Sequence, residues 1–168
     1  MVPVTAIACA FLLARRRAPE AIALSAGLAI TQITTQIIKG AVDRPRPGDG
    51  IADASGFAYP SGHASLSVTY LALAVVLSRA VPAAWRIAMV VAGTVLAVAI
   101  GLSRVYMRVH YLTDVVGGWS VGLAVFSLCG AVALIVEYLR HNSGSPQEPR
   151  RSEWTASQSP TSSSERPV

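Results

Sequence analysis

Apolar residues fall in five runs along the chain, and the short segments between them hold most of the charged residues. The runs cover residues 2–14, 18–38, 61–79, 83–103 and 112–139. Three of them are about 20 residues long and the last is longer; a helix of about 20 residues crosses a hydrocarbon core of roughly 30 Å. No polar helix face recurs within these runs to meet water. The pattern predicts an all-α integral membrane bundle with four clear spans and a short first helix.

The composition favours this membrane bundle over a soluble helical protein with several buried helices. Charged residues make up 14% of the 168 and hydrophobic residues 52%, whereas a typical soluble domain is roughly 25% charged. The net charge of +5 does not indicate a nucleic-acid partner, because the basic residues do not gather with aromatics on one face. Cys9 and Cys129 each lie within an apolar run, which predicts packed side chains and neither a disulfide nor a metal site.

Composition also divides the chain into two parts. Residues 1–139 form the predicted membrane domain. Residues 140–168 are rich in Ser, Pro, Glu and Arg, which predicts a disordered cytoplasmic tail. Within the domain, residues 40–60 are expected to form a loop, because Pro45 and Pro47 forbid a regular helix there.

The basic residues divide between the two ends of the predicted spans. Nine of the fourteen lie at the end that the positive-inside rule assigns to the cytoplasm: Arg15, Arg16, Arg17, Arg79, Arg86, Arg140, Arg150, Arg151 and Arg166. The other five lie at the opposite end: Lys39, Arg44, Arg46, Arg104 and Arg108. Because charges near membrane depth are costly, the second group is expected to serve a site at the extracytoplasmic face of the plasma membrane.

Because successive spans cross the membrane in opposite directions, the first residue is placed outside the cytoplasm, ahead of a run that is short for a span. Absence of an upstream helix from a six-helix bundle would account for both points. The alternative is a first segment that is tilted or lies in the membrane interface.

The residues expected at the extracytoplasmic end suit a phosphate ester. Lys39, Arg46 and Arg104 offer an ammonium and two guanidinium forks, which match phosphate oxygens. Ser61 is a good N-cap, and with Gly62 it begins a helix whose free N–H groups and dipole favour an anion. No metal or other cofactor is expected, because the cations supply the electrostatic stabilisation.

Two histidines complete the predicted site. His110 and Asp114 are four residues apart, so the carboxylate can accept Nδ1–H and leave Nε2 free to attack phosphorus. His63, beside the Pro-Ser-Gly turn, can protonate the departing alkoxide and then activate water. Outside this set, Arg44 is expected to steer an anionic headgroup, and Arg108 to pair with lipid or with Asp43, Asp49 or Asp53.

These motifs resemble the type 2 phosphatidic acid phosphatase superfamily, whose soluble relatives include vanadium haloperoxidases. The resemblance covers about residues 18–136 and rests on three patterns: Lys39 and Arg46-Pro47 with six residues between them, Pro60-Ser61-Gly62-His63, and Ser103-Arg104 followed by His110 and Asp114. It implies that His110 is the nucleophile oriented by Asp114 and that His63 is the general acid. It also implies that the phosphoryl group is held by Lys39, Arg46, Ser61, Gly62 and Arg104.

The leading hypothesis is therefore a metal-independent membrane phosphatase, acting on a lipid phosphate or polyprenyl pyrophosphate through a phosphohistidine. Three alternatives stay open at this point: a lipid phosphotransferase, a haloperoxidase that holds vanadate in the same pocket, and a non-catalytic protein that binds or transports phospholipids. The substrate depends on the loop 48–59 and on access between helices, which the sequence does not define.

Overall fold

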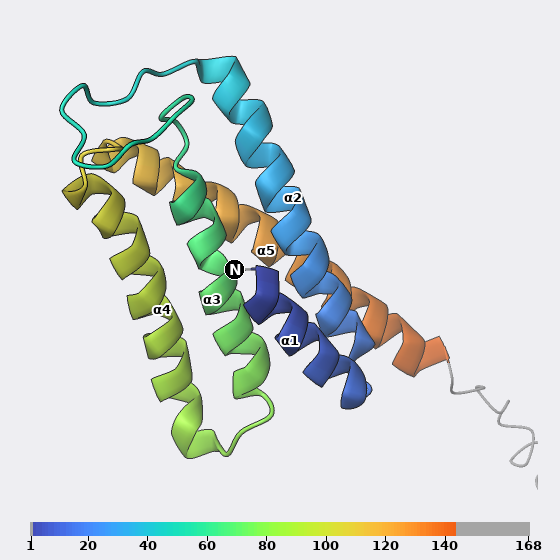
Figure 1. Ribbon diagram of the computed structural model, residues 1–168. Helices are drawn as coiled ribbons and strands as arrows, with labels where there is room; N and C mark the ends of the chain where they lie inside the picture. Colours follow the sequence, from blue (N-terminus) through green and yellow to red (C-terminus); the bar gives the residue numbers. More distant parts are fainter. Residues whose placement is uncertain (1, 144–168) are drawn as a thin grey trace, which may run out of the picture.

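Five helices make up the protein in its computed structural model, which describes residues 2–143. They are α1 (Val2–Ala14), α2 (Ala18–Val42), α3 (Gly62–Ser78), α4 (Ala83–Tyr106) and α5 (Leu112–Ser143), and the described part of the chain contains no strand. Figure 1 shows α2 to α5 arranged as an up-and-down bundle, with the short α1 beside α2 and α3. The five elements lie where the apolar runs predict them.

Three of the helices are long and apolar enough to cross a membrane: α2, α4 and α5. The third predicted span is shorter than expected, because α3 has 17 residues and is about 25 Å long at 1.5 Å per residue. Ser61 caps its start through the Ala64 N–H, and Arg79 is its C-cap. Since α3 packs against all four other helices, protein covers much of its surface.

Helix ends differ from the ends of the apolar runs because a charge ends a run without ending a helix. The α2 helix continues past Lys39 to Val42, where Asp43 adopts a left-handed conformation and its N–H bonds to the Lys39 carbonyl. The α5 helix continues to Ser143, so residues 140–143 are helical and the expected tail boundary at 140 is wrong. The expectation of disorder for residues 144–168 lies outside the described residues.

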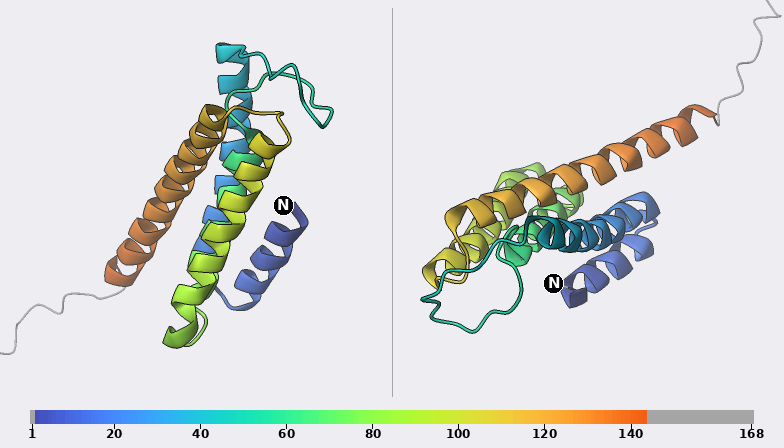
Figure 2. Two further views of the ribbon diagram at one scale, coloured as in Figure 1. Left: turned by 90° about the vertical axis from the view of Figure 1, so that its left-hand side faces the viewer. Right: turned by 90° about the horizontal axis from the view of Figure 1, so that it is seen from above.

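The two groups of basic residues lie at opposite ends of the bundle, as the alternating direction of the spans predicts. The α2–α3 loop covers one end, next to the α4–α5 turn (Figure 2), and Ile51 N–H bonds to the Met107 carbonyl there at 3.0 Å. At the other end, Arg17 pairs with Glu20 at 2.7 Å, and Arg79 lies 4.0 Å from the same carboxylate. The sidedness of the two ends stays a prediction.

Glycines in α5 let α3 come close to it. A Cβ at Gly118 would lie 2.5 Å from the Ser61 carbonyl oxygen, and one at Gly122 would lie 2.5 Å from the Ser65 carbonyl oxygen. Both contacts are with backbone, which cannot rotate away as a side chain can. The absence of these two side chains therefore sets how near the start of α3 lies to the start of α5.

Gly118→Ala is expected to destabilise the protein by about 1–3 kcal/mol, because the added methyl group overpacks this contact. Thermal unfolding in detergent micelles measures the effect. Gly130→Ala is the matched control on the same helix, because a Cβ there meets nothing within 4 Å. Equal melting temperatures for the two variants would contradict the packing argument.

Candidate active site

The predicted site residues converge at the end of the bundle that the α2–α3 loop covers. Lys39, Arg46, Gly62, His63 and His110 line a cavity of about 470 Å³. Arg104 lines a second cavity of about 300 Å³, which shares Arg46, His63 and His110 with the first. Ser61 and Asp114 lie fully buried behind these residues. All eight predicted residues are thus brought together from four helices and two loops.

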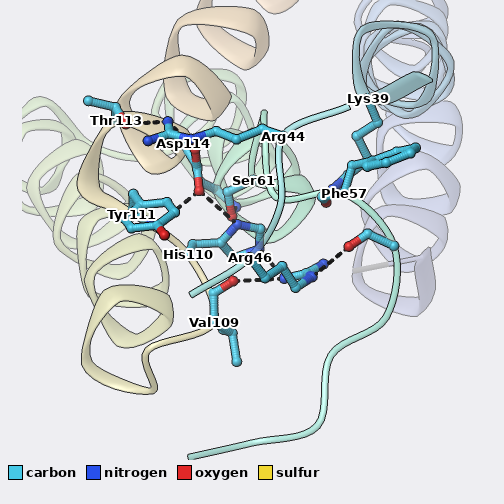
Figure 3. Close-up of polar contacts among 12 residues, drawn as sticks. Lys39, Arg44, Arg46, Phe57, Ser61, Val109, His110, Tyr111, Thr113 and Asp114 are labelled. Carbon is cyan, nitrogen blue, oxygen red and sulfur yellow. Dashed lines mark hydrogen bonds and ion pairs between the residues drawn. The ribbon is translucent and has the colours of Figure 1, made fainter. Parts of the chain in front are cut away.

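His110 lies in the α4–α5 turn, with its ring held between Arg46 and Asp114 (Figure 3). Its Nε2 is 3.2 Å from Arg46 Nη1, and its Nδ1 is 3.5 Å from Asp114 Oδ2. Because a guanidinium only donates hydrogen bonds, Nε2 must be the accepting nitrogen and Nδ1 must carry the proton. The surroundings therefore select the tautomer that leaves the Nε2 lone pair facing the cavities.

Burial and the nearby cations Arg46 and Lys39 lower the pKa of His110 to about 4. The Asp114 carboxylate and a backbone hydrogen bond with Ala58 act in the opposite direction. An imidazole with this pKa is neutral at pH 7. His110 is therefore available as a nucleophile without first losing a proton.

Asp114 connects the starts of α3 and α5. Its backbone carbonyl accepts the Ser61 N–H at 2.9 Å, and its Oδ2 accepts the Tyr111 N–H at 2.9 Å. The side chain has no exposed surface. Ser61 in turn uses its own hydroxyl as the cap of α3, while Gly62 lines the first cavity.

Arg46 and Lys39 are held in the cavity wall by backbone carbonyls. Arg46 donates from Nε to Gly56 at 2.9 Å, from Nη2 to Ser55 at 3.0 Å and from Nη1 to Val109 at 2.9 Å. Lys39 Nζ donates to the Phe57 carbonyl. Each of these groups has N–H bonds to spare or to exchange, so a phosphate would bind by replacing neutral acceptors with charged ones.

His63 and Arg104 reach the cavities from α3 and α4. His63 begins the first turn of α3 and lines both cavities. Arg104 lies in the last turn of α4, and its Nε donates to Ser103 Oγ at 3.3 Å. A group bound where the cavities meet would therefore lie near the two histidines, with Lys39 lining one cavity and Arg104 the other.

Two arginines outside the motifs have clear partners. Arg108 pairs with Asp49 at 2.8 Å, one of the loop carboxylates that the sequence analysis names. Arg44 does not lie free to meet a headgroup, because its Nη1 is 2.8 Å from Asp114 Oδ1. Sequence reasoning missed this contact, since 70 residues separate the partners and no motif spacing links them.

Comparison with known proteins gives the family. The model of the PAP2 superfamily matches residues 20–136. The chain belongs to the PAP2 superfamily. Its match covers almost the same residues as the resemblance found in the sequence, so that expectation is confirmed.

Two relatives illustrate the similarity. Phosphatidylglycerophosphatase B of Bacillus subtilis (strain 168) is 35% identical over 102 residues, which are 58% of this chain and 50% of the relative. The chain thus spans about half the length of that curated relative. A similar fold is found in the crystal structure of the first transmembrane PAP2 type phosphatidylglycerolphosphate phosphatase from Bacillus subtilis. The TM-score is 0.73 at 28% identity, over 78% of this chain and 67% of that one.

These relatives and the apolar helices confirm the predicted fold class. The chain is a multi-pass, all-helical membrane protein of the PAP2 type. The difference from the expected architecture is confined to α3, which is shorter than a full span.

Proposed function

We propose that this PAP2 protein is a membrane lipid phosphatase that works through a phosphohistidine on His110. The observation that carries the proposal is the arrangement at His110. Its Nε2 faces a cavity lined by Lys39, Arg46 and His63, while Asp114 lies behind Nδ1. Membership of the PAP2 superfamily and similarity to a phosphatidylglycerophosphatase support the same reaction class.

In the first step, Nε2 of His110 forms a bond to phosphorus and the bond from phosphorus to the lipid oxygen breaks. His63, as the imidazolium, gives its proton to that oxygen. Arg46 Nη1 moves its hydrogen bond from Nε2 to a phosphate oxygen, which frees the lone pair. Lys39, Arg46, Arg104 and the N–H groups at Gly62 stabilise the charge on the equatorial oxygens.

In the second step, His63 is neutral and takes a proton from water. The water oxygen bonds to phosphorus, the P–N bond breaks, and inorganic phosphate leaves. His110 returns to its neutral form, with Nδ1–H facing Asp114. The cations already present provide the electrostatic stabilisation, so the proposed reaction needs no metal ion.

The proposed substrate is a phosphate monoester or diphosphate whose apolar tail stays in the bilayer. The cavities lie at one end of the bundle, where the helices present apolar side chains to lipid, among them Ile33 and Ile37 of α2. Phosphatidylglycerophosphate is the first candidate, because the relatives carry that specificity in their names. A polyprenyl pyrophosphate is the second. The positive-inside distribution supports an extracytoplasmic site in the plasma membrane.

A panel of lipid phosphates tests this function. The full chain in detergent micelles, with EDTA present, would be given phosphatidylglycerophosphate, phosphatidate, undecaprenyl pyrophosphate and a sphingoid phosphate. We expect free phosphate from at least one lipid, with a clear rate preference among the four. A phosphorylated acceptor in place of free phosphate would indicate phosphotransfer, and binding without turnover would indicate a non-catalytic lipid-binding protein.

A further inference from the structure

Arg44 lies at the start of the α2–α3 loop, and its side chain contacts the start of α5. Its Nη1 donates to Thr113 Oγ1 at 2.7 Å and to Asp114 Oδ1 at 2.8 Å. The guanidinium carbon lies 4.4 Å from the centre of the Tyr111 ring, and Figure 3 shows the three partners around it. The Arg44 carbonyl also accepts the Ala58 N–H at 2.8 Å, so backbone and side chain fix this residue together.

The two oxygens of the Asp114 carboxylate have different partners. Oδ1 accepts from Arg44, while Oδ2 accepts the Tyr111 N–H and faces His110 Nδ1. A carboxylate with no exposed surface is costly unless a cation compensates it. Among the described residues, Arg44 is the cation that hydrogen-bonds to this group. Without it, the buried carboxylate would lose its cationic partner, and Oδ2 would no longer be held towards His110.

We propose that Arg44 is a positioning residue, which holds the Asp114 carboxylate in the orientation that keeps the His110 proton on Nδ1 and presents Nε2 to phosphorus. The inference rests on the proposed function, because it concerns the same nucleophile. Arg44 acts through Asp114 and does not contact the phosphate. This assignment replaces the role of headgroup steering that the sequence suggests for it.

Loss of Arg44 changes the surroundings of Nδ1 of His110. Asp114 raises the pKa of His110 and faces Nδ1 at 3.5 Å. If Asp114 turns away when Arg44 is lost, the Nδ1–H loses its charged neighbour, and the neutral ring can carry its proton on Nε2 instead. A ring that is protonated on Nε2 has no lone pair there to attack phosphorus.

Arg44→Met tests the proposal, and Arg108→Met is its matched control. Both changes remove one positive charge at the same end of the bundle, but Arg108 pairs with the exposed Asp49. At pH 7 we expect Arg44→Met to lower kcat by roughly 10–100-fold, with KM nearly unchanged. ¹⁵N NMR of the His110 ring in micelles at pH 7 should show the proton on Nδ1 in the wild type and a substantial Nε2–H population in Arg44→Met. Arg108→Met should match the wild type in both readouts.

Several results would overturn the inference. A raised KM with unchanged kcat would assign Arg44 to headgroup binding, and a lower melting temperature with normal kcat and tautomer would assign it a purely structural role. If Arg44→Met does not fold, Arg44→Lys replaces it. That variant should lose kcat and populate the Nε2–H tautomer, and full activity would overturn the proposal. Because the NMR measurement needs no turnover, it still tests the inference if the wild type hydrolyses none of the lipids.

Discussion

His110→Gln is expected to abolish phosphate release, with a loss in kcat on the order of 10⁴-fold or more, as for the removal of other enzymatic nucleophiles. The side chain is 4% exposed, so the variant must also preserve the buried contacts. Glutamine suits this purpose, because its amide oxygen can accept from Arg46 and its amide nitrogen can donate towards Asp114. An amide is a poor nucleophile, so the chemistry is lost and the packing is kept.

Release of free phosphate and thermal unfolding, measured on the same micelle preparation, separate chemistry from folding. His141→Gln is the matched control, because His141 lies in the last turn of α5, at the other end of that helix from Asp114. Full activity in His110→Gln would contradict the nucleophilic mechanism. A large fall in melting temperature would instead show that His110 is needed for the fold.

His63→Ala is expected to give the second-largest effect, and its size should depend on the leaving group. With a lipid phosphate the departing alkoxide needs a proton, so the loss should be roughly 10²–10⁴-fold. An aryl phosphate has a leaving group that departs without a proton. With that substrate the first step should proceed while the second step, which needs a base for water, stays slow.

Rapid-mixing kinetics with p-nitrophenyl phosphate measures this difference. We expect a burst of p-nitrophenol close to one equivalent per active site, followed by slow turnover. The wild type should show no such burst, because its second step is not impaired. An equal loss for the alkyl and aryl esters, without a burst, would mean that His63 binds phosphate and does not transfer protons.

Much of this site could be predicted because helix ends are easy to locate in an apolar sequence. Once the runs fix which way each helix crosses, Lys39, Gly62, Arg104 and Asp114 must meet at one end of the bundle. The motif spacings then identify the two histidines. Ionisable residues at the ends of membrane helices carry more information than the same residues on a soluble surface, because they are costly to place there.

The remainder depends on contacts between distant segments. The pairing of Arg44 with Asp114 joins the α2–α3 loop to α5, and the bonds from Arg46 to the carbonyls of Ser55 and Gly56 depend on the path of that loop. Proline and glycine show that residues 40–60 are not helical, but they do not define the path. The start of α3 was predicted from its N-cap Ser61, but its 17 residues are fewer than a full span needs.

Direct detection of the intermediate tests the central claim most closely. His63→Ala would be mixed with p-nitrophenyl phosphate, quenched in alkali, digested and analysed by mass spectrometry, with His63→Ala/His110→Gln as the control. The account predicts a phosphoryl group on the His110 peptide that survives alkali, is lost in acid, and is missing from the double variant. Full burst kinetics with an unmodified His110 peptide, or with the phosphoryl group on another residue, would contradict it.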